Sequence, residues 1–266
     1  MTEPRYVRIA LRIATIAVLA FIYLPIVVLI IYAFNSSKIQ AWPPAGFTVD
    51  WFVEAARNTS IITALKNSLI AATVATTLAL ALGTLAALAV QRYDFFGRQT
   101  ISFIFVLPLA LPGVITGIAL RTSYTTFGID LGLMTIILGH ATFCVVVIYN
   151  NVLARLRRVP RTAEEASADL GADSFTTFRR VTLPAVRTAL LAGALLAFGL
   201  SFDEIIVTIF TAGAGTQTLP MWIYSAIQRP NELPVVNVVA VVVIMLSVIP
   251  VYVAQRLSGD VASASL

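Results

Sequence analysis

Residues 155–187 read RLRRVPRTAEEASADLGADSFTTFRRVTLPAVR, and the chain on either side of them is almost entirely apolar. These 33 residues hold seven arginines, whereas the preceding run, 131–154, contains no Asp, Glu, Lys or Arg. An uncharged run of that length suits a helix that crosses the ~30 Å hydrocarbon core of a bilayer, which takes about 20 residues. The sequence therefore predicts a charged segment between two membrane-spanning helices.

The composition of the whole chain also indicates that lipid is its main solvent. Of the 266 residues, 59% are hydrophobic and 12% are charged, about half of the ~25% charged share in a typical soluble domain. This composition excludes a disordered chain and an ordinary soluble enzyme. The single Cys excludes a module held together by internal disulfides.

Six apolar runs reach the length of a span, so the predicted fold class is an all-α multi-pass membrane protein with six transmembrane helices. Between the last two runs, residues 211–232 are interrupted by Gly and Pro, which predicts a loop with a short interfacial helix near 221–227, or a re-entrant segment. Pro108 and Pro112 make the third run prone to a kink. The six runs are 13–34, 67–90, 99–120, 131–154, 188–210, which carries Asp203 and Glu204, and 233–255.

The basic residues predict how the chain is oriented in the membrane. Six spans place both termini on the side of residues 155–187, where thirteen of the 18 Lys and Arg residues lie. Because cytoplasmic loops are enriched in Lys and Arg, we expect both termini in the cytoplasm. The first span should remain as an anchor, since its 22 uncharged residues exceed the ~7 to 15 of a signal-peptide core. The positive charge then reflects orientation, and we expect no nucleic-acid partner.

The start of the charged segment has the signals of a short helix. Thr162 and Glu165 have the spacing of a capping box, in which each side chain accepts a hydrogen bond from the other residue's amide. Gly171 would end this helix in the left-handed conformation. A helix of this length is marginal in water, so it must be stabilised by packing.

A second short helix should follow in the same segment. We expect it to begin at Asp173 or Ser174 and to end before Leu183 and Pro184, where the fifth span begins. The two helices would form a hairpin held against the membrane. Small residues at 166–168 would allow a partner surface to approach closely.

A spaced motif in this hairpin resembles the cytoplasmic EAA loop of permease subunits in bacterial binding-protein-dependent ABC importers. Ser167 stands where that family usually has Ala, and Val181 where it has Ile. The resemblance covers residues 63–254 and implies a type I importer permease fold with a core of the methionine-importer type. Residues 1–62 would add a first span and an outer loop, and 255–266 a cytoplasmic tail. The motif consists of Glu165-Ala166-Ser167, Gly171 after three residues, Val181, and Leu183-Pro184.

The resemblance implies that this chain works with several partners in a bacterial inner membrane. In that family the loop docks into a cleft of an ATPase dimer. A second permease subunit, a different chain in the polyamine type, and an extracytoplasmic solute-binding protein complete the assembly. The residues to which the resemblance gives a role in ATPase coupling are Glu164, Glu165, Ala166, Ser167, Asp169, Gly171, Leu183 and Pro184.

The sequence contains no G-x-x-x-x-G-K-[ST] phosphate-binding motif. We therefore expect ATP and Mg to be bound by a separate ATPase, with no cofactor on this chain and no enzymatic activity of its own. Closure of the ATPase dimer would draw the coupling helices together and tilt the spans between inward-open and outward-open states.

Asp203 and Glu204 are the strongest indication of a transported solute. A carboxylate within a span costs about 2.5 to 3.5 kcal/mol on insertion scales and usually faces a cavity. On a continuous helix Glu204 would share a polar stripe with Ser201 and Thr208, so we expect Glu204 to line the path. Asp203 would assist or be paired. An outer vestibule, or hydrogen bonds to a neighbouring helix, is the alternative environment for both carboxylates.

Residues 201–208 and 218–222 resemble the fifth-span region of the spermidine/putrescine subclass of these permeases. The resemblance implies a polyamine, whose ammonium groups need counter-charges. Trp222 would add a cation–aromatic contact, or would serve as an interfacial anchor. Aminophosphonates, opines and Fe(III) are alternative solutes on the same scaffold.

Two other classes of function remain open. An ATP-independent carrier or channel would leave the charged hairpin unexplained. An intramembrane enzyme is disfavoured, because a lone His without a Ser or Cys motif provides no nucleophile and base. His140 and Cys144 lie one helical turn apart, but two ligands do not make a zinc site. We expect a packed core pair there, and no metal.

Overall fold

The computed structural model describes the backbone of residues 5–263 and the side chains of residues 5–108 and 110–248. Within that range the chain is helical, apart from loops and one isolated β-bridge between Asn35 and Phe47. Residues 1–4 of the predicted N-terminal region and residues 264–266 of the predicted tail, 255–266, lie outside the described residues. The all-α multi-pass fold class is confirmed.

Five helical segments are long and apolar enough to cross a membrane, and there are six if one bent pair of helices counts as a single span. The bent pair consists of α4, Arg98–Ala110, and α5, Gly113–Thr126, which meet at 101°. The five segments are α1, Arg5–Ala33; α3, Thr59–Arg92; α6, Leu133–Leu156; Ser174–Asp203, which includes α9, Leu183–Asp203; and α12, Leu233–Ser263.

Contacts divide the chain into two compact units. The first extends to Thr59 and includes Ile223–Ile249, and the second contains Ser60–Trp222 and the chain from Pro250. In the first unit, the predicted outer loop is folded around Asn35. Its side-chain oxygen accepts from the amide of Ala45 (3.1 Å) and its carbonyl from the indole of Trp51 in α2, Asp50–Arg57 (2.8 Å).

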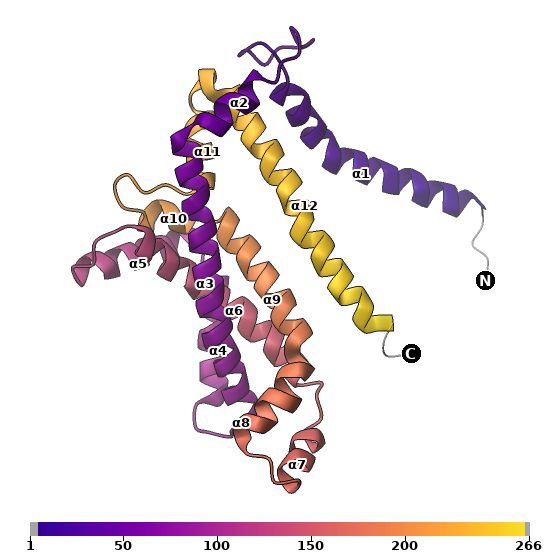
Figure 1. Ribbon diagram of the computed structural model, residues 1–266, viewed down its shortest axis with the longest axis vertical. Coiled ribbons are helices and arrows are strands. Elements are labelled where there is room, and N and C mark those ends of the chain that lie inside the picture. The colour runs from indigo at the N-terminus through magenta and orange to yellow at the C-terminus, as the bar shows by residue number, and fades with distance from the viewer. Residues whose placement is uncertain (1–4, 264–266) are drawn as a thin grey trace. The chain divides into compact units, whose positions relative to one another are not determined.

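In the second unit, close packing of small residues brings α3, α6 and α9 together. The buried face of α3 consists mainly of Ala, Gly, Ser and Thr, residue types that let helix backbones approach in membranes. Gly83 of α3 lies against Ile148 of α6, and Gly193 of α9 contacts the same isoleucine. A helical hairpin lies at one end of this unit, and α5 and α10, Ile206–Thr211, lie farther along α3 from it (Figure 1).

The third predicted span is broken between α4 and α5. Leu111 adopts an extended conformation (ψ 141°) directly before Pro112. A residue before proline is disfavoured in the helical region, and proline has no amide hydrogen to continue the helix. The predicted kink is therefore confirmed as a full break, whereas Pro108 lies within α4.

The fifth predicted span is also broken, and here the prediction of a continuous helix through residue 210 was wrong. Helix α9 ends at Asp203, Glu204 is extended (ψ 121°), and α10 begins at Ile206. The break contains neither Gly nor Pro, so no local signal marked it. The side chains described below take over the hydrogen bonds that the helix loses.

The segment after α10 agrees with the prediction of a loop with a short helix. That helix is α11, Leu219–Ile227, and a 3₁₀ turn over Pro230–Glu232 leads into α12. The loop before α11 is attached to α3, because Asn67 donates to the carbonyl of Gln217 (2.8 Å) and Ser68 accepts from the amide of Leu219 (2.8 Å).

The α3–α6 packing predicts the effect of a single methyl group. A Cβ at Gly83 would lie 2.9 Å from both the Val145 carbonyl oxygen and the Ile148 Cβ. We expect Gly83→Ala to destabilise the protein by about 1–3 kcal/mol, measured as a lower thermal midpoint of the purified protein. Gly199→Ala is the matched control, since no atom among the described residues lies within 4 Å of that Cβ. Equal losses in both variants would contradict the packing argument.

Candidate functional site

The hairpin of the second unit consists of α7, Thr162–Asp169, and α8, Ser174–Thr177. Gly171 has φ +82°, as predicted. Its amide donates to the carbonyl of Ala168 (2.8 Å), and the next amide, Ala172, donates to that of Ser167 (3.1 Å). This pair of bonds is a Schellman motif, which satisfies carbonyls at the end of α7 and requires the left-handed glycine.

The predicted capping box at the start of α7 was wrong. Thr162 is the first helical residue, and the preceding Arg161 adopts a helical conformation at the N-cap position with no side-chain cap. The Arg161 carbonyl accepts from the amides of both Glu164 (2.9 Å) and Glu165 (3.0 Å). The helix therefore begins one residue earlier than a Thr162 cap would require, and the Glu165 side chain is exposed.

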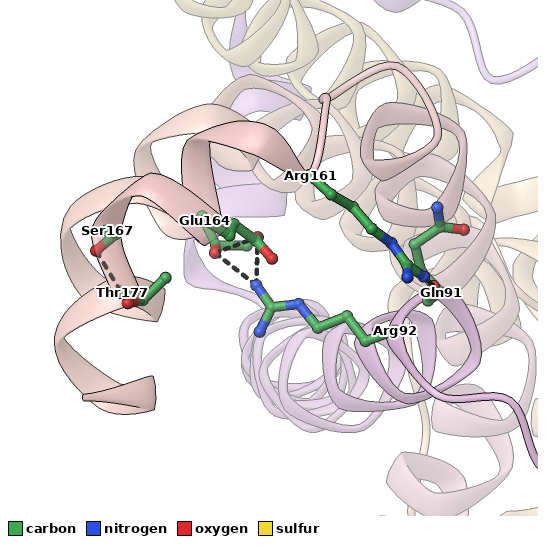
Figure 2. A network of polar contacts seen from close by, with 7 residues as sticks. Gln91, Arg92, Arg161, Glu164, Ser167 and Thr177 are labelled. Carbon is green, nitrogen blue, oxygen red and sulfur yellow. Dashed lines mark hydrogen bonds and ion pairs between the residues drawn. The ribbon is translucent and has the colours of Figure 1, made fainter. Parts of the chain in front are cut away.

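Glu164 fixes α7 to the end of α3 and to the start of the fifth span. Its carboxylate forms an ion pair with Arg92 of α3 and accepts from the Thr182 hydroxyl (2.7 Å). Arg92 also donates to Thr182 (2.6 Å). Figure 2 shows Arg92 pointing from α3 toward Glu164, with Arg161 reaching Gln91 beside it. The Arg161 guanidinium donates to the Gln91 carbonyl (2.6 Å), so two contacts tie the hairpin to α3.

The second helix begins at Ser174, one of the two predicted starts, and Asp173 caps it by accepting from the amide of Thr176 (2.8 Å). Hydrogen bonds from the Thr176 side chain and amide hold the pKa of Asp173 below its ordinary value. The cap is therefore fully present above the ordinary pKa and is lost as the pH falls through the lowered one.

The second helix does not end before Leu183 and Pro184, which corrects the prediction. It continues through a π-helical turn, Phe178–Thr182, into α9. In that turn the amide of Leu183 donates to the carbonyl of Phe178, five residues back. The wider turn lets the helix pass Pro184, which provides no amide hydrogen. Ser174–Asp203 is thus one helical segment of 30 residues.

The hairpin leaves an apolar surface exposed. A groove of about 710 Å³ lies along α7 and the π-helical turn, with Ala166, Ser167 and Gly171 in its lining. Leu170, also in the lining, is 89% exposed, and Phe175 is 69% exposed. Of the predicted coupling residues, Glu165, Ala166, Asp169, Gly171 and Pro184 are exposed, Ser167 and Leu183 are half-buried, and Glu164 is directed into the network of Figure 2.

Away from the hairpin, Glu204 occupies the break between α9 and α10. Its carboxylate accepts from the amide of Val207 (2.9 Å), and its carbonyl accepts from the Thr208 hydroxyl (2.8 Å). These bonds replace those of a continuous helix, because a carboxylate can satisfy an amide at a helix start. Glu204 is half-buried, whereas Asp203 is exposed.

The other predicted path residues are buried. Ser201 is 2% exposed, Thr208 0% and Trp222 3%. The first two bond the ring nitrogens of His140, with Nδ1 2.8 Å from the Ser201 oxygen and Nε2 2.8 Å from the Thr208 oxygen. The expected stripe of Glu204, Ser201 and Thr208 is thus interrupted by the break and covered by α6. A role for these residues in the solute path stays a prediction.

Sequence analysis did not identify His140 as part of a polar site. Its partners are 61 and 68 residues away along the chain, and spacing within one span cannot reveal partners on another. It is the only His in the sequence, and it occurs in an otherwise uncharged span. Those two facts are the signals that were available. Among the described residues no cluster of three potential metal ligands occurs.

A set of helices long and apolar enough to span a membrane, two of them broken, with a helical hairpin beside them is the architecture of a multi-pass membrane protein. The sequence matches the family described as "Binding-protein-dependent transport system inner membrane component" over residues 79–261. That is more than half of the chain. The chain belongs to this family, and it is therefore the membrane-embedded permease component of an importer that works with a binding protein.

Two relatives cover most of the chain. The putrescine transport system permease protein PotI of Escherichia coli (strain K12) is 37% identical over 232 residues, which span 84% of this chain and 82% of PotI. The spermidine/putrescine transport system permease protein PotC of the same strain is 34% identical over 245 residues, 92% of each chain.

The fold also matches a solved structure. The crystal structure of a bacterial alginate ABC transporter, in complex with a periplasmic protein that holds an alginate pentasaccharide, contains a chain with a TM-score of 0.74. The match covers 96% of this chain and 95% of that one at 18% sequence identity. The importer permease fold implied by the EAA-type motif is thereby confirmed.

The two adjacent glutamates of α7 should behave differently. Glu164 is bonded to Arg92 and Thr182, whereas Glu165 is exposed. We expect Glu164→Gln to weaken the attachment of α7 by about 1 kcal/mol, or roughly fivefold in local opening. Hydrogen exchange of the α7 amides measures this opening. Glu165→Gln is the matched control and should leave the exchange rates unchanged, and equal exchange in the two variants would contradict the role given to Glu164.

Proposed function

We propose that this permease forms half of the translocation path of an ATP-driven importer for a polyamine such as putrescine or spermidine. The proposal is supported by two relatives that are named as polyamine permeases. It is supported independently by two adjacent carboxylates at a break within a membrane-spanning segment. A linear cation with two or more ammonium groups is a solute that such carboxylates can bind.

The carboxylates at the break carry the proposal. Breaks in membrane helices are where many transporters place their binding sites, because the freed polar groups face a cavity. One oxygen of Glu204 accepts from the Val207 amide, and a carboxylate has further lone pairs for an ammonium group. Asp203 is exposed, and no described residue bonds its carboxylate. Two negative groups are thus available for a polyamine.

The hairpin is the proposed coupling element, and its partner is an ATPase dimer. The groove beside α7 has a mixed polar and apolar lining, and together with the exposed Leu170 and Phe175 it forms a surface of the kind that protein partners cover. The Glu164 network makes the hairpin a firm extension of α3 and of the fifth span. A displacement of the hairpin by the ATPase would therefore be passed to the helices. ATP and Mg bind to the ATPase, and this chain acts without a cofactor.

The remaining parts of the proposal concern topology and assembly. The basic residues favour both termini in the cytoplasm of the bacterium. Residues 1–62 form a first span and an outer loop ahead of the importer core, 63–254, and residues 255–266 form a cytoplasmic tail. A second permease chain and an extracytoplasmic solute-binding protein complete the importer. The family's description supports the binding protein.

Reversal of the charge at Glu165 tests the coupling assignment. We expect Glu165→Arg to lower the amount of ATPase that copurifies with the permease at least about tenfold, because a contact charge of the wrong sign costs several kcal/mol. The protein should still insert, since Glu165 is exposed in this chain. Asp94→Arg, at an exposed residue before α4, is the control. Undiminished ATPase binding by the Glu165 variant would contradict the assignment.

Removal of one charge at the break tests the solute assignment. We expect Glu204→Gln to raise the KM for polyamine uptake roughly 10- to 100-fold, because a charge-assisted hydrogen bond contributes about 1.5–3 kcal/mol. The measurement is uptake of radiolabelled putrescine and spermidine by cells that carry the complete importer. Asp130→Asn, at an exposed loop residue, is the matched control. Unchanged uptake by the Glu204 variant would remove Glu204 from the path.

A further inference from the structure

His140 connects the two halves of the broken fifth span. The ring lies in α6 and is 1% exposed. Ser201 belongs to α9 and Thr208 to α10, and each hydroxyl oxygen lies 2.8 Å from a different ring nitrogen. One side chain therefore bonds both sides of the break at Glu204 and Ile205.

The direction of these hydrogen bonds follows from Thr208. A hydroxyl has one hydrogen, and that of Thr208 is donated to the Glu204 carbonyl (2.8 Å). The Thr208 oxygen must then accept from Nε2–H of His140. In the neutral ring the other nitrogen, Nδ1, accepts, so Ser201 donates to it. A single directed chain of hydrogen bonds runs from Ser201 through His140 and Thr208 to the backbone of Glu204.

Other contacts restrict α10 to the same place against α6. The hydroxyl of Thr135 lies 2.7 Å from the carbonyl of Thr211 at the end of α10 and 2.8 Å from that of Gly132, so its one hydrogen is shared between the two. Gly139 allows α10 to approach closely, since a Cβ there would lie 3.1 Å from the Val207 side chain. Helix α10 has six residues, far fewer than an isolated helix needs. Its position therefore depends on these attachments and on its packing against α5, where Gly113 faces Ile206 and Gly117 faces Phe210.

The position of α10 in turn determines where the Glu204 carboxylate lies. That carboxylate is bonded to the amide of Val207, inside α10, and its own carbonyl is bonded to Thr208. A shift of α10 relative to α9 would move both anchors of Glu204 together. His140 contacts both helices, and neither of its two ring hydrogen bonds goes to the Glu204 carboxylate.

We infer that His140 is a positioning residue for solute binding: by clamping Ser201 of α9 to Thr208 of α10, it sets the geometry of the break that presents the Glu204 carboxylate to the transported cation. This inference rests on the proposed role of Glu204 as a solute ligand. The clamp itself is a property of the helices, so it can be tested without solute.

The first experiment measures the break directly in the purified importer. Cys144 is the only cysteine of this chain, so Cys144→Ser gives a background in which Ile205→Cys reports on the break through its rate of maleimide labelling. We expect His140→Phe, which removes both hydrogen bonds, to raise the rate about fivefold or more. His140→Gln keeps a donor and an acceptor and should stay within about twofold. Equal labelling of all three proteins overturns the clamp.

The second experiment measures putrescine uptake by cells with the complete importer. We expect His140→Phe to raise KM about tenfold with the maximal rate within about twofold, and His140→Gln to restore most of the affinity. Combined with Glu204→Gln, His140→Phe should cause no further loss, because it acts through Glu204. Multiplied losses in the double variant overturn the inference. Ser201→Ala and Thr208→Val each remove one end of the clamp and should each raise KM by part of the same amount. They serve as the test if His140→Phe prevents assembly of the importer.

The two experiments separate the inference from the proposed function. Faster labelling of His140→Phe, together with unchanged putrescine KM in both His140→Phe and Glu204→Gln, would leave the clamp in place and remove Glu204 as a solute ligand. Unchanged labelling, together with a raised KM in Glu204→Gln, would keep the solute ligand and overturn the role of His140.

Discussion

Lipid offers no hydrogen-bond partners, so every backbone amide and carbonyl within a membrane span must be satisfied by the protein itself. A continuous helix meets this requirement without help from side chains. A broken one does not, and at the break between α9 and α10 the Glu204 carboxylate accepts from the Val207 amide while the Thr208 hydroxyl donates to the Glu204 carbonyl. His140 bonds the Thr208 hydroxyl in turn. Polar side chains within this span thus stabilise the break, and they are also the groups that a cationic solute can bind.

Adjacent acidic residues occur at two places in the second unit, and at each place the structure gives the two residues different environments. In the hairpin, Glu164 is bonded to Arg92 and Thr182 while Glu165 is exposed. At the break, Glu204 caps α10 while Asp203 is exposed. One carboxylate of each pair is hydrogen-bonded within the protein, and its neighbour is exposed. In α7 the two positions point about 100° apart, whereas at the break Glu204 is extended and lies outside both helices.

The spans and the hairpin could be predicted from sequence because their signals are local. An uncharged run of about 20 residues has few alternatives to a transmembrane helix, and Gly171 and Asp173 occur where a left-handed stop and a cap are needed. The prediction of a capping box failed because the spacing of Thr162 and Glu165 does not exclude a helix that begins one residue earlier. The prediction of a continuous helix through Glu204 failed for a different reason. Two of the bonds at the break, from the Val207 amide and the Thr208 hydroxyl to Glu204, are local but come without a Gly or Pro that would mark a break. The bonds to His140 come from α6, and no pattern within the fifth span encodes them.

The helical segment Ser174–Asp203 joins the hairpin to the break at Glu204, and its attachments explain how they can act together. Thirty residues at 1.5 Å per residue extend about 45 Å, the order of a membrane's full thickness. Thr182, near one end, is bonded to Glu164 of the hairpin, and Ser201, near the other, is bonded to His140. A helix held by side-chain bonds at both ends moves its ends together or breaks those bonds. A displacement of the hairpin must therefore either carry the break at Glu204 with it or release Ser201 from His140, and both outcomes change the environment of the carboxylates.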